Sequence, residues 1–235
     1  MSPTHFLPAV RLSYARLRSD APALMRAGLP AMVIGFAVPA ISLLPFPGAD
    51  LMAMVLNALA FGVFGVAWMR FIAAGEAPGR PVHLRLGKRE IMVAVFSEIM
   101  GMFTAVPLIL TAMMTDATGT HEWAPLLGPV AVQLFLVLMG AAYLLLPDAA
   151  LAVKGQPGRR LHEIVQAGGL SVGIAYVLAG LPFTLVVVLV GALVPAPEGL
   201  PARLALQGVV LVPSILSAAA GWGVLAMCWK ELKAA

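Results

Sequence analysis

The hydrophobic positions of this chain gather into long, nearly uninterrupted runs separated by short polar stretches. Each run approaches the roughly 20 apolar residues that an α-helix needs to cross a bilayer. A barrel strand would alternate apolar and polar positions, whereas Val186–Val190 reads VVVLV. The pattern therefore predicts an all-α polytopic membrane protein with six transmembrane helices, in a single integral membrane domain over residues 1–235. We place the spans at residues 27–45, 51–74, 91–114, 125–147, 169–195 and 204–229.

Residues 1–26, which precede the first run, are interpreted as a cytoplasmic amphipathic segment. Between residues 5 and 20, apolar side chains share one face of a helix and arginines lie elsewhere on it. Such a helix is expected to lie in the membrane interface, and an ordinary basic flank is the alternative. The apolar face consists of Phe6, Leu7, Val10, Tyr14 and Leu17.

Basic residues alternate between the two sides of the predicted spans. Fourteen of the 15 Lys and Arg residues fall in the N-terminal segment, around residues 70–90, within 148–168 or in the C-terminal tail, and Arg203 is the exception. Because cytoplasmic loops are enriched in Lys and Arg, we expect both termini to be cytoplasmic.

The same alternation groups the spans into three helical hairpins. Each hairpin follows a basic, partly amphipathic stretch, at residues 5–20, 82–90 and 157–166. We hypothesise three units, each an interfacial helix followed by a hairpin, since internal repeats are common in membrane folds. The similar Gly/Pro/Arg turns at residues 75–80 and 155–159 agree with a repeat, but any hairpin exit uses such residues.

Composition and charge narrow the class of protein. Hydrophobic residues make up 61% and charged residues 11% of the chain, and the mean hydropathy is +0.96. In soluble proteins about 45–50% of residues are hydrophobic and about 25% are charged, so a soluble enzyme is excluded. Cys228 is the only cysteine, which excludes an intrachain disulfide and a multi-cysteine metal site.

The net charge of +4 predicts contact with anionic phospholipid rather than with nucleic acid. The residues expected to bind lipid headgroups are Arg11, Arg16, Arg18, Arg80, Arg85, Lys88 and Arg89.

Charged residues inside the predicted spans are the main candidates for function. Glu98 lies within the third span, where a carboxylate is costly unless it is paired or protonated. Arg70, near the end of the second span, is its expected partner in a structural ion pair, and Asp148 competes for Arg70. The alternative is that Glu98 handles a proton or a substrate.

Three amide side chains also fall within spans, toward their outer ends: Asn57, Gln133 and Gln207. They would line an outward-facing polar cavity or, as is more common, join helices by hydrogen bonds.

Catalytic patterns in the chain are incomplete. Gly169–Gly173 (GLSVG) matches the nucleophile-elbow pattern, but no histidine follows His162. The same residues form a G-x-x-x-G motif of close helix packing, which we prefer. The histidines are scattered, the carboxylates are dispersed, and no P-loop is present. We therefore predict a protein that is not an enzyme and uses no metal ion or cofactor.

Residues 68–78, at the end of the second span, read WMRFIAAGEAP. This stretch resembles a W-x-R-[FY]-x-x-x-G-[ED]-x-P signature of poorly characterised bacterial six-helix membrane proteins. Those proteins are often described as similar to the membrane domain of glycerophosphoryl diester phosphodiesterases, or as YciC-like. Residues 143–152 (YLLLPDAALA) loosely resemble their fourth-span exit, and Met69 departs from the usual His or Tyr. The resemblance implies a membrane domain and not the hydrolase, which is a separate soluble domain in that group.

Two functions compete at this point. The first is a scaffold, assembly factor or accessory subunit that contacts anionic phospholipid and either a membrane-protein partner or a second copy of the chain. The second is a small transporter or channel-like protein that uses Glu98, with Asn57 and Gln133 in its path. They differ in whether Glu98 faces a water-filled cavity or lies against Arg70.

Overall fold

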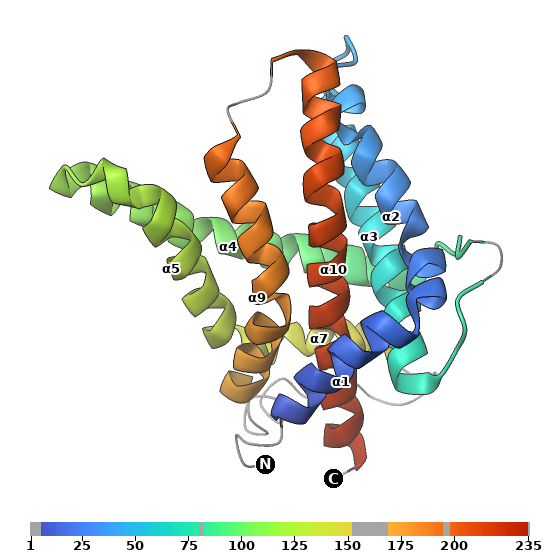
Figure 1. Cartoon of the computed structure of the whole chain (residues 1–235). Coiled ribbons are helices and arrows are strands. Elements are labelled where there is room, and N and C mark those ends of the chain that lie inside the picture. The colour runs from blue at the N-terminus through green and yellow to red at the C-terminus, as the bar shows by residue number, and fades with distance from the viewer. Residues whose placement is uncertain (1–5, 80–81, 152–168, 195–197, 235) are drawn as a thin grey trace.

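Helices form the regular structure of the chain. The computed structural model describes residues 6–79, 82–151, 169–194 and 198–234, and it contains no strand within these ranges (Figure 1). The helices are α1 (Phe6–Ser19), α2 (Ala21–Ser42), α3 (Ala49–Ala74), α4 (Lys88–Thr118), the 3₁₀ turn η2 (His121–Trp123), α5 (Ala124–Leu138), α6 (Gly140–Tyr143), α7 (Leu145–Leu151), α9 (Gly169–Leu193) and α10 (Gly199–Ala234).

Within the described ranges, five helices, α2, α3, α4, α9 and α10, are long and apolar enough to cross a membrane, judged by length and composition. They correspond to the first, second, third, fifth and sixth predicted spans, although α2 ends at Ser42 and α9 at Leu193, slightly before the predicted ends. Several extend beyond the apolar run, because a helix continues through polar residues until a capping or breaking residue ends it. The architecture is all-helical, and these five helices fit a multi-pass membrane protein.

The predicted fourth span, residues 125–147, is not one continuous helix. The chain forms α5, turns at Met139, forms the single-turn α6 and continues as α7. Pro147 explains the second break, because its ring would clash with the carbonyl of Tyr143 and its nitrogen has no hydrogen to donate. α5 has 15 residues, fewer than the roughly 20 of a full span.

The core is centred on α3 and α10. Phe64 and Trp68 of α3 are fully buried, and the Phe64 ring meets Trp222 of α10 edge-on, with ring centroids 5.1 Å apart. The Trp68 indole N–H donates to the carbonyl of Ala219 at 2.8 Å. Residues 217–223 of α10 read SAAAGWG, and these small residues let the large aromatic rings of α3 approach the α10 backbone.

α1 lies across α9 and α10, near the end of α10 (Figure 1). The Ser13 hydroxyl donates to the carbonyl of Ala220 at 2.8 Å, and the Tyr14 hydroxyl donates to that of Ala179 at 2.7 Å. The predicted amphipathic helix is therefore present, but its apolar face around Val10 and Tyr14 packs on protein rather than on lipid. Leu7 of the same face is exposed.

The segment from Lys88 to Leu138, which we call the α4–α5 arm, packs differently from the rest. In Figure 1, α4 crosses the other long helices and α5 returns from its far end. Only 11% of the apolar window of α4 is buried, against 50% for α3 and 56% for α10. α2 contacts α3 and α9 contacts α10 extensively, but three equivalent hairpin units stay a prediction.

Candidate functional site

Residues 68–78 form a connected structure at the end of α3. Trp68 ties the helix to α10, and the Arg70 guanidinium forms an ion pair with Glu76, with Nε 2.7 Å from Oε2. Gly75 lies between them with φ +70°, and its N–H donates to the carbonyl of Phe71 at 3.0 Å. This left-handed helix end favours glycine. The motif thus anchors α3 and fixes the chain that leaves it.

A basic cup lies between the end of α3 and the start of α4. We use this name for a cavity of about 770 Å³ lined by α3 around Arg70, by residues 76–79 and by most of residues 82–90. The charged side chains in its described lining are Arg70, Arg85, Lys88, Arg89, Glu76 and Glu90. Four basic groups against two carboxylates leave the cup positively charged.

Both carboxylates of the cup already have partners. Glu76 is held by Arg70, and the Glu90 carboxylate accepts the Gly87 N–H at 2.9 Å, which caps the start of α4. Arg85 and Lys88 are exposed, and neither forms an ion pair with any residue that the structure describes. These two cations are therefore available to an external anion.

His83 holds the loop of the cup in place. Its Nδ1 accepts the N–H of Gly79 at 3.1 Å, and its own backbone N–H donates to the carbonyl of Arg26 at 3.2 Å, which ties the loop to α2. Burial lowers the pKa of His83; Glu90 acts in the opposite direction, and Arg85 and Arg70 lower the pKa further. A neutral imidazole that accepts at Nδ1 carries its proton on Nε2. That atom is buried and unpartnered in the described part of the chain.

The residues predicted to bind headgroups fall into two groups. Arg11, Arg16 and Arg18 are exposed on α1, where Arg16 pairs with Asp20 at 3.1 Å. Arg85, Lys88 and Arg89 line the cup, and Arg80 lies outside the described residues. Because α1 leads directly into α2, and the cup loop is bonded to α2 at Arg26, both groups lie at one end of the bundle.

The charged candidates within the spans do not pair as expected. Arg70 pairs with Glu76 rather than with Glu98, because the chain turns at Gly75 and brings Glu76 back beside Arg70. Asp148 instead accepts the Trp229 indole N–H at 3.2 Å, which joins α7 to α10. Glu98 is partly buried, and its carboxylate has no hydrogen bond or ion pair among the residues described.

The three amides have three different surroundings. The Gln207 side chain donates to the carbonyl of Gly35 at 2.9 Å, which confirms its predicted role in joining helices. The Asn57 side-chain oxygen lies 3.5 Å from the position that a Cβ on Gly35 would take. Gln133 instead lines a second cavity, which we call the polar cavity.

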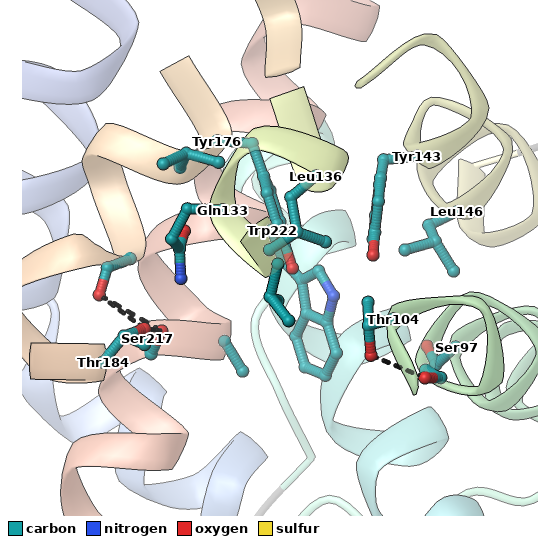
Figure 2. A pocket seen from close by; sticks show the side chains of 15 residues that line it. Ser97, Thr104, Gln133, Leu136, Tyr143, Leu146, Tyr176, Thr184, Ser217 and Trp222 are labelled. Carbon is teal, nitrogen blue, oxygen red and sulfur yellow. Dashed lines mark hydrogen bonds between the residues drawn. The ribbon is translucent and has the colours of Figure 1, made fainter. Parts of the chain in front are cut away.

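The polar cavity lies among α4, α5, α9, α10 and the α6–α7 segment (Figure 2). Its volume is about 350 Å³. Glu98 is not part of the described lining of this cavity or of the basic cup. A transport role for Glu98 therefore stays a prediction, without support from either cavity.

The G-x-x-x-G motif at residues 169–173 is confirmed as a packing motif. A Cβ on Gly173 would lie 2.1 Å from the carbonyl oxygen of Val137, and one on Gly140 would lie 2.3 Å from Gly173. α9 thus touches the end of α5 and the start of α6 backbone to backbone. Ser171 lies in the first turn of α9, not in the strand–turn–helix of a nucleophile elbow.

Sequence reasoning missed most of the polar cavity. Its α9 side presents Tyr176, Gly180 and Thr184, and its α4 side presents Ser97, Gly101 and Thr104. A spacing of three or four residues places small and polar side chains on one helix face. This periodicity of small and polar residues within apolar runs is the sequence feature that could have revealed the cavity. In the cup, Glu76 and His83 were missed, although Glu76 belongs to the motif at residues 68–78.

Comparisons with known proteins identify no relative. No protein-family model, no curated protein and no solved structure matches this chain.

Proposed function

We propose that this chain is a non-enzymatic protein of the bacterial inner membrane that binds the phosphate headgroup of an anionic phospholipid in the basic cup. It would serve as a scaffold, assembly factor or accessory subunit for a membrane-protein partner. The observation that carries the proposal is the cup itself, a cavity with four basic side chains in which both carboxylates are already engaged.

The chemistry of the cup suits an anionic ligand such as a phosphate rather than a cationic one. Arg offers several N–H donors in a fixed fork that matches phosphate oxygens, and Lys adds a point charge. Arg85 and Lys88 supply one of each. The exposed arginines of α1 lie at the same end of the bundle and would add weaker, screened attraction to an anionic leaflet.

The orientation follows from the same charges. If the cup and α1 contact the cytoplasmic leaflet, the ends of the chain near α1 and α10 face the cytoplasm, as the positive-inside rule predicts. A sixth crossing would require α5 together with α6 and α7 to span the bilayer as a broken helix, and this remains part of the proposal.

Thermal unfolding in detergent micelles tests the proposal. Dihexanoyl phosphatidylglycerol is the anionic probe, with dihexanoyl phosphatidylcholine and inorganic phosphate in parallel. A ligand that binds only the folded state at 100 times its Kd stabilises by about 2.7 kcal/mol. We expect phosphatidylglycerol to raise the Tm more than phosphatidylcholine does. A response to inorganic phosphate alone would mean that the cup binds free phosphate and not a lipid.

The matched variants are Arg85→Gln with Lys88→Gln in the cup, and Arg203→Gln as the control. Arg203 is exposed near the start of α10 and lies outside the cup. The cup variant should lose the phosphatidylglycerol response, and Arg203→Gln should keep it. An equal response in both variants would refute the cup as the binding site.

A further inference from the structure

Several polar groups of the polar cavity have no partner among the residues that the structure describes. The residues Trp222 and Tyr143 are 5% and 6% exposed, and across the described chain nothing accepts from the Trp222 indole N–H or the Tyr143 hydroxyl. The Gln133 amide is also unbonded in these parts, and the buried Ser97 hydroxyl has no partner. Among these groups only the Ser97 hydroxyl is a buried polar atom, and the polar atoms of Trp222, Tyr143 and Gln133 are open to the cavity. An occupant with acceptor atoms would reach these donors and stabilise this arrangement.

The cavity selects against charge. Figure 2 shows the Trp222 indole nitrogen and the Tyr143 hydroxyl on the same side of the Trp222 ring, with Gln133 on the opposite side of that ring in this view. The Thr104 hydroxyl donates to the carbonyl of Gly101 at 2.6 Å. The described lining contains no Asp, Glu, Lys, Arg or His. Without a counter-charge, an ionised group would be strongly disfavoured there. The polar part of a ligand must therefore be uncharged and carry oxygen acceptors for the N–H and O–H donors.

An apolar groove continues from this cavity along α5 and α9. The groove has a volume of about 320 Å³, and it shares Gln133, Val177 and Thr184 with the polar cavity. The rest of its described lining is apolar and comes from Pro129 to Val137 of α5 and Leu181 to Val188 of α9. A polar chamber that opens into an apolar groove matches a molecule with a small polar head and a hydrocarbon tail.

We propose that the polar cavity and the apolar groove together bind a lipid with an uncharged head, whose hydroxyl and ester oxygens meet Trp222, Tyr143 and Gln133 and whose tail lies between α5 and α9. Each chamber falls within the roughly 300–1,000 Å³ typical of small-molecule sites. This site is separate from the basic cup in position and in charge. A failure of anionic-lipid binding at the cup would therefore not affect this proposal.

Photolabelling tests this site in nanodiscs of phosphatidylcholine. The probe is a diacylglycerol that carries a diazirine on one acyl chain, and labelled residues are mapped by peptide mass spectrometry. We expect labels to concentrate on α5 and α9 along the groove. Unlabelled diacylglycerol should compete, whereas phosphatidic acid with the same tails should not, because its head is charged.

Two variants separate binding from folding. Gln133→Leu removes an amide that makes no hydrogen bond within the described part of the chain, and Trp222→Phe keeps an aromatic ring in the core but removes the N–H. Each variant should weaken labelling, and the double variant, which loses both hydrogen bonds to the lipid head, should weaken it about tenfold or more. Trp123→Phe is the control, because Trp123 is 52% exposed and lies outside both chambers.

Three results would overturn the proposal. Labels spread evenly over the exposed face of α4 would indicate ordinary boundary lipid. Equal competition by phosphatidic acid would show that the site does not exclude charge. Labelling unchanged in both Gln133→Leu and Trp222→Phe would show that the polar groups do not hold the head.

Discussion

The helices α3 and α4 are both apolar enough to cross a membrane, yet they pack in opposite ways. Half of the apolar window of α3 is buried inside the protein, against 11% for α4. α3 presents Gly62, Gly65 and several alanines to its neighbours, whereas α4 exposes large side chains such as Met102 and Met113. In a membrane, lipid solvates apolar side chains as well as protein does, so small residues decide which helices pack closely.

The largest expected effect is the difference between a Met→Ala substitution on α3 and the same substitution on α4. Met69 of α3 is fully buried, and Met102 of α4 is 73% exposed. Met69→Ala should lower the free energy of unfolding by about 2–5 kcal/mol, because it leaves a cavity in the core. Met102→Ala should change it by less than about 0.5 kcal/mol. Thermal unfolding in one detergent measures both, and equal losses would contradict the contrast between the helices.

The crossing of α3 and α4 can be tested with glycine. A Cβ on Gly62 would lie 2.4 Å from the carbonyl oxygen of Glu90, whereas one on Gly101 would meet nothing within 4 Å. Gly62→Ala should destabilise by about 1–3 kcal/mol, since two backbones must separate. Gly101→Ala should be neutral or stabilise by up to about 1 kcal/mol through helix propensity. A neutral Gly62→Ala would mean that the two helices do not touch there.

The Arg70–Glu76 ion pair should have a smaller effect. Its side chains are 23% and 50% exposed, so solvent screening limits the pair to about 0–1 kcal/mol. In a double-mutant cycle, Arg70→Gln and Glu76→Gln should be coupled, whereas Arg70→Gln and Glu98→Gln should be additive. Coupling to Glu98 instead would restore the ion pair that the sequence suggested.

The smallest effect concerns pH and His83. Its pKa is lowered in the folded protein, so below about pH 6.5 the unfolded chain binds a proton that the folded chain does not. Stability should therefore fall as the pH drops below this value toward the lowered pKa. His83→Gln should flatten this part of a Tm profile measured between pH 7.5 and 5.5. A profile unchanged by His83→Gln would show that another group titrates.

Hydrophobic runs predicted the long helices well, because each run is nearly continuous and only one structure buries its backbone polar groups. The same reasoning failed at residues 125–147, where Pro147 and the close contact between Gly140 and Gly173 interrupt an otherwise apolar run. A hydropathy average gives proline no special weight, although a single proline removes a backbone hydrogen bond and interrupts the helix at its own position.

Which residues a charged side chain pairs with was harder to predict than which helix carries it. Arg70 was assigned to Glu98 because both lie in neighbouring spans, yet the turn at Gly75 brings Glu76 back to Arg70 first. A local contact of this kind costs little chain entropy, and so it prevails over a distant one. The polar cavity needed the arrangement of α4, α5, α9 and α10, which no single run of sequence contains.

Native mass spectrometry of the purified protein tests the basic cup most directly. Wild type and Arg203→Gln should each retain one anionic phospholipid, and the double variant Arg85→Gln with Lys88→Gln should lose it. A stoichiometric protein partner in the same spectra would identify the assembly that the chain serves. If the double variant retained the anionic lipid as fully as wild type, the cup would not be its binding site and the proposed function would be contradicted.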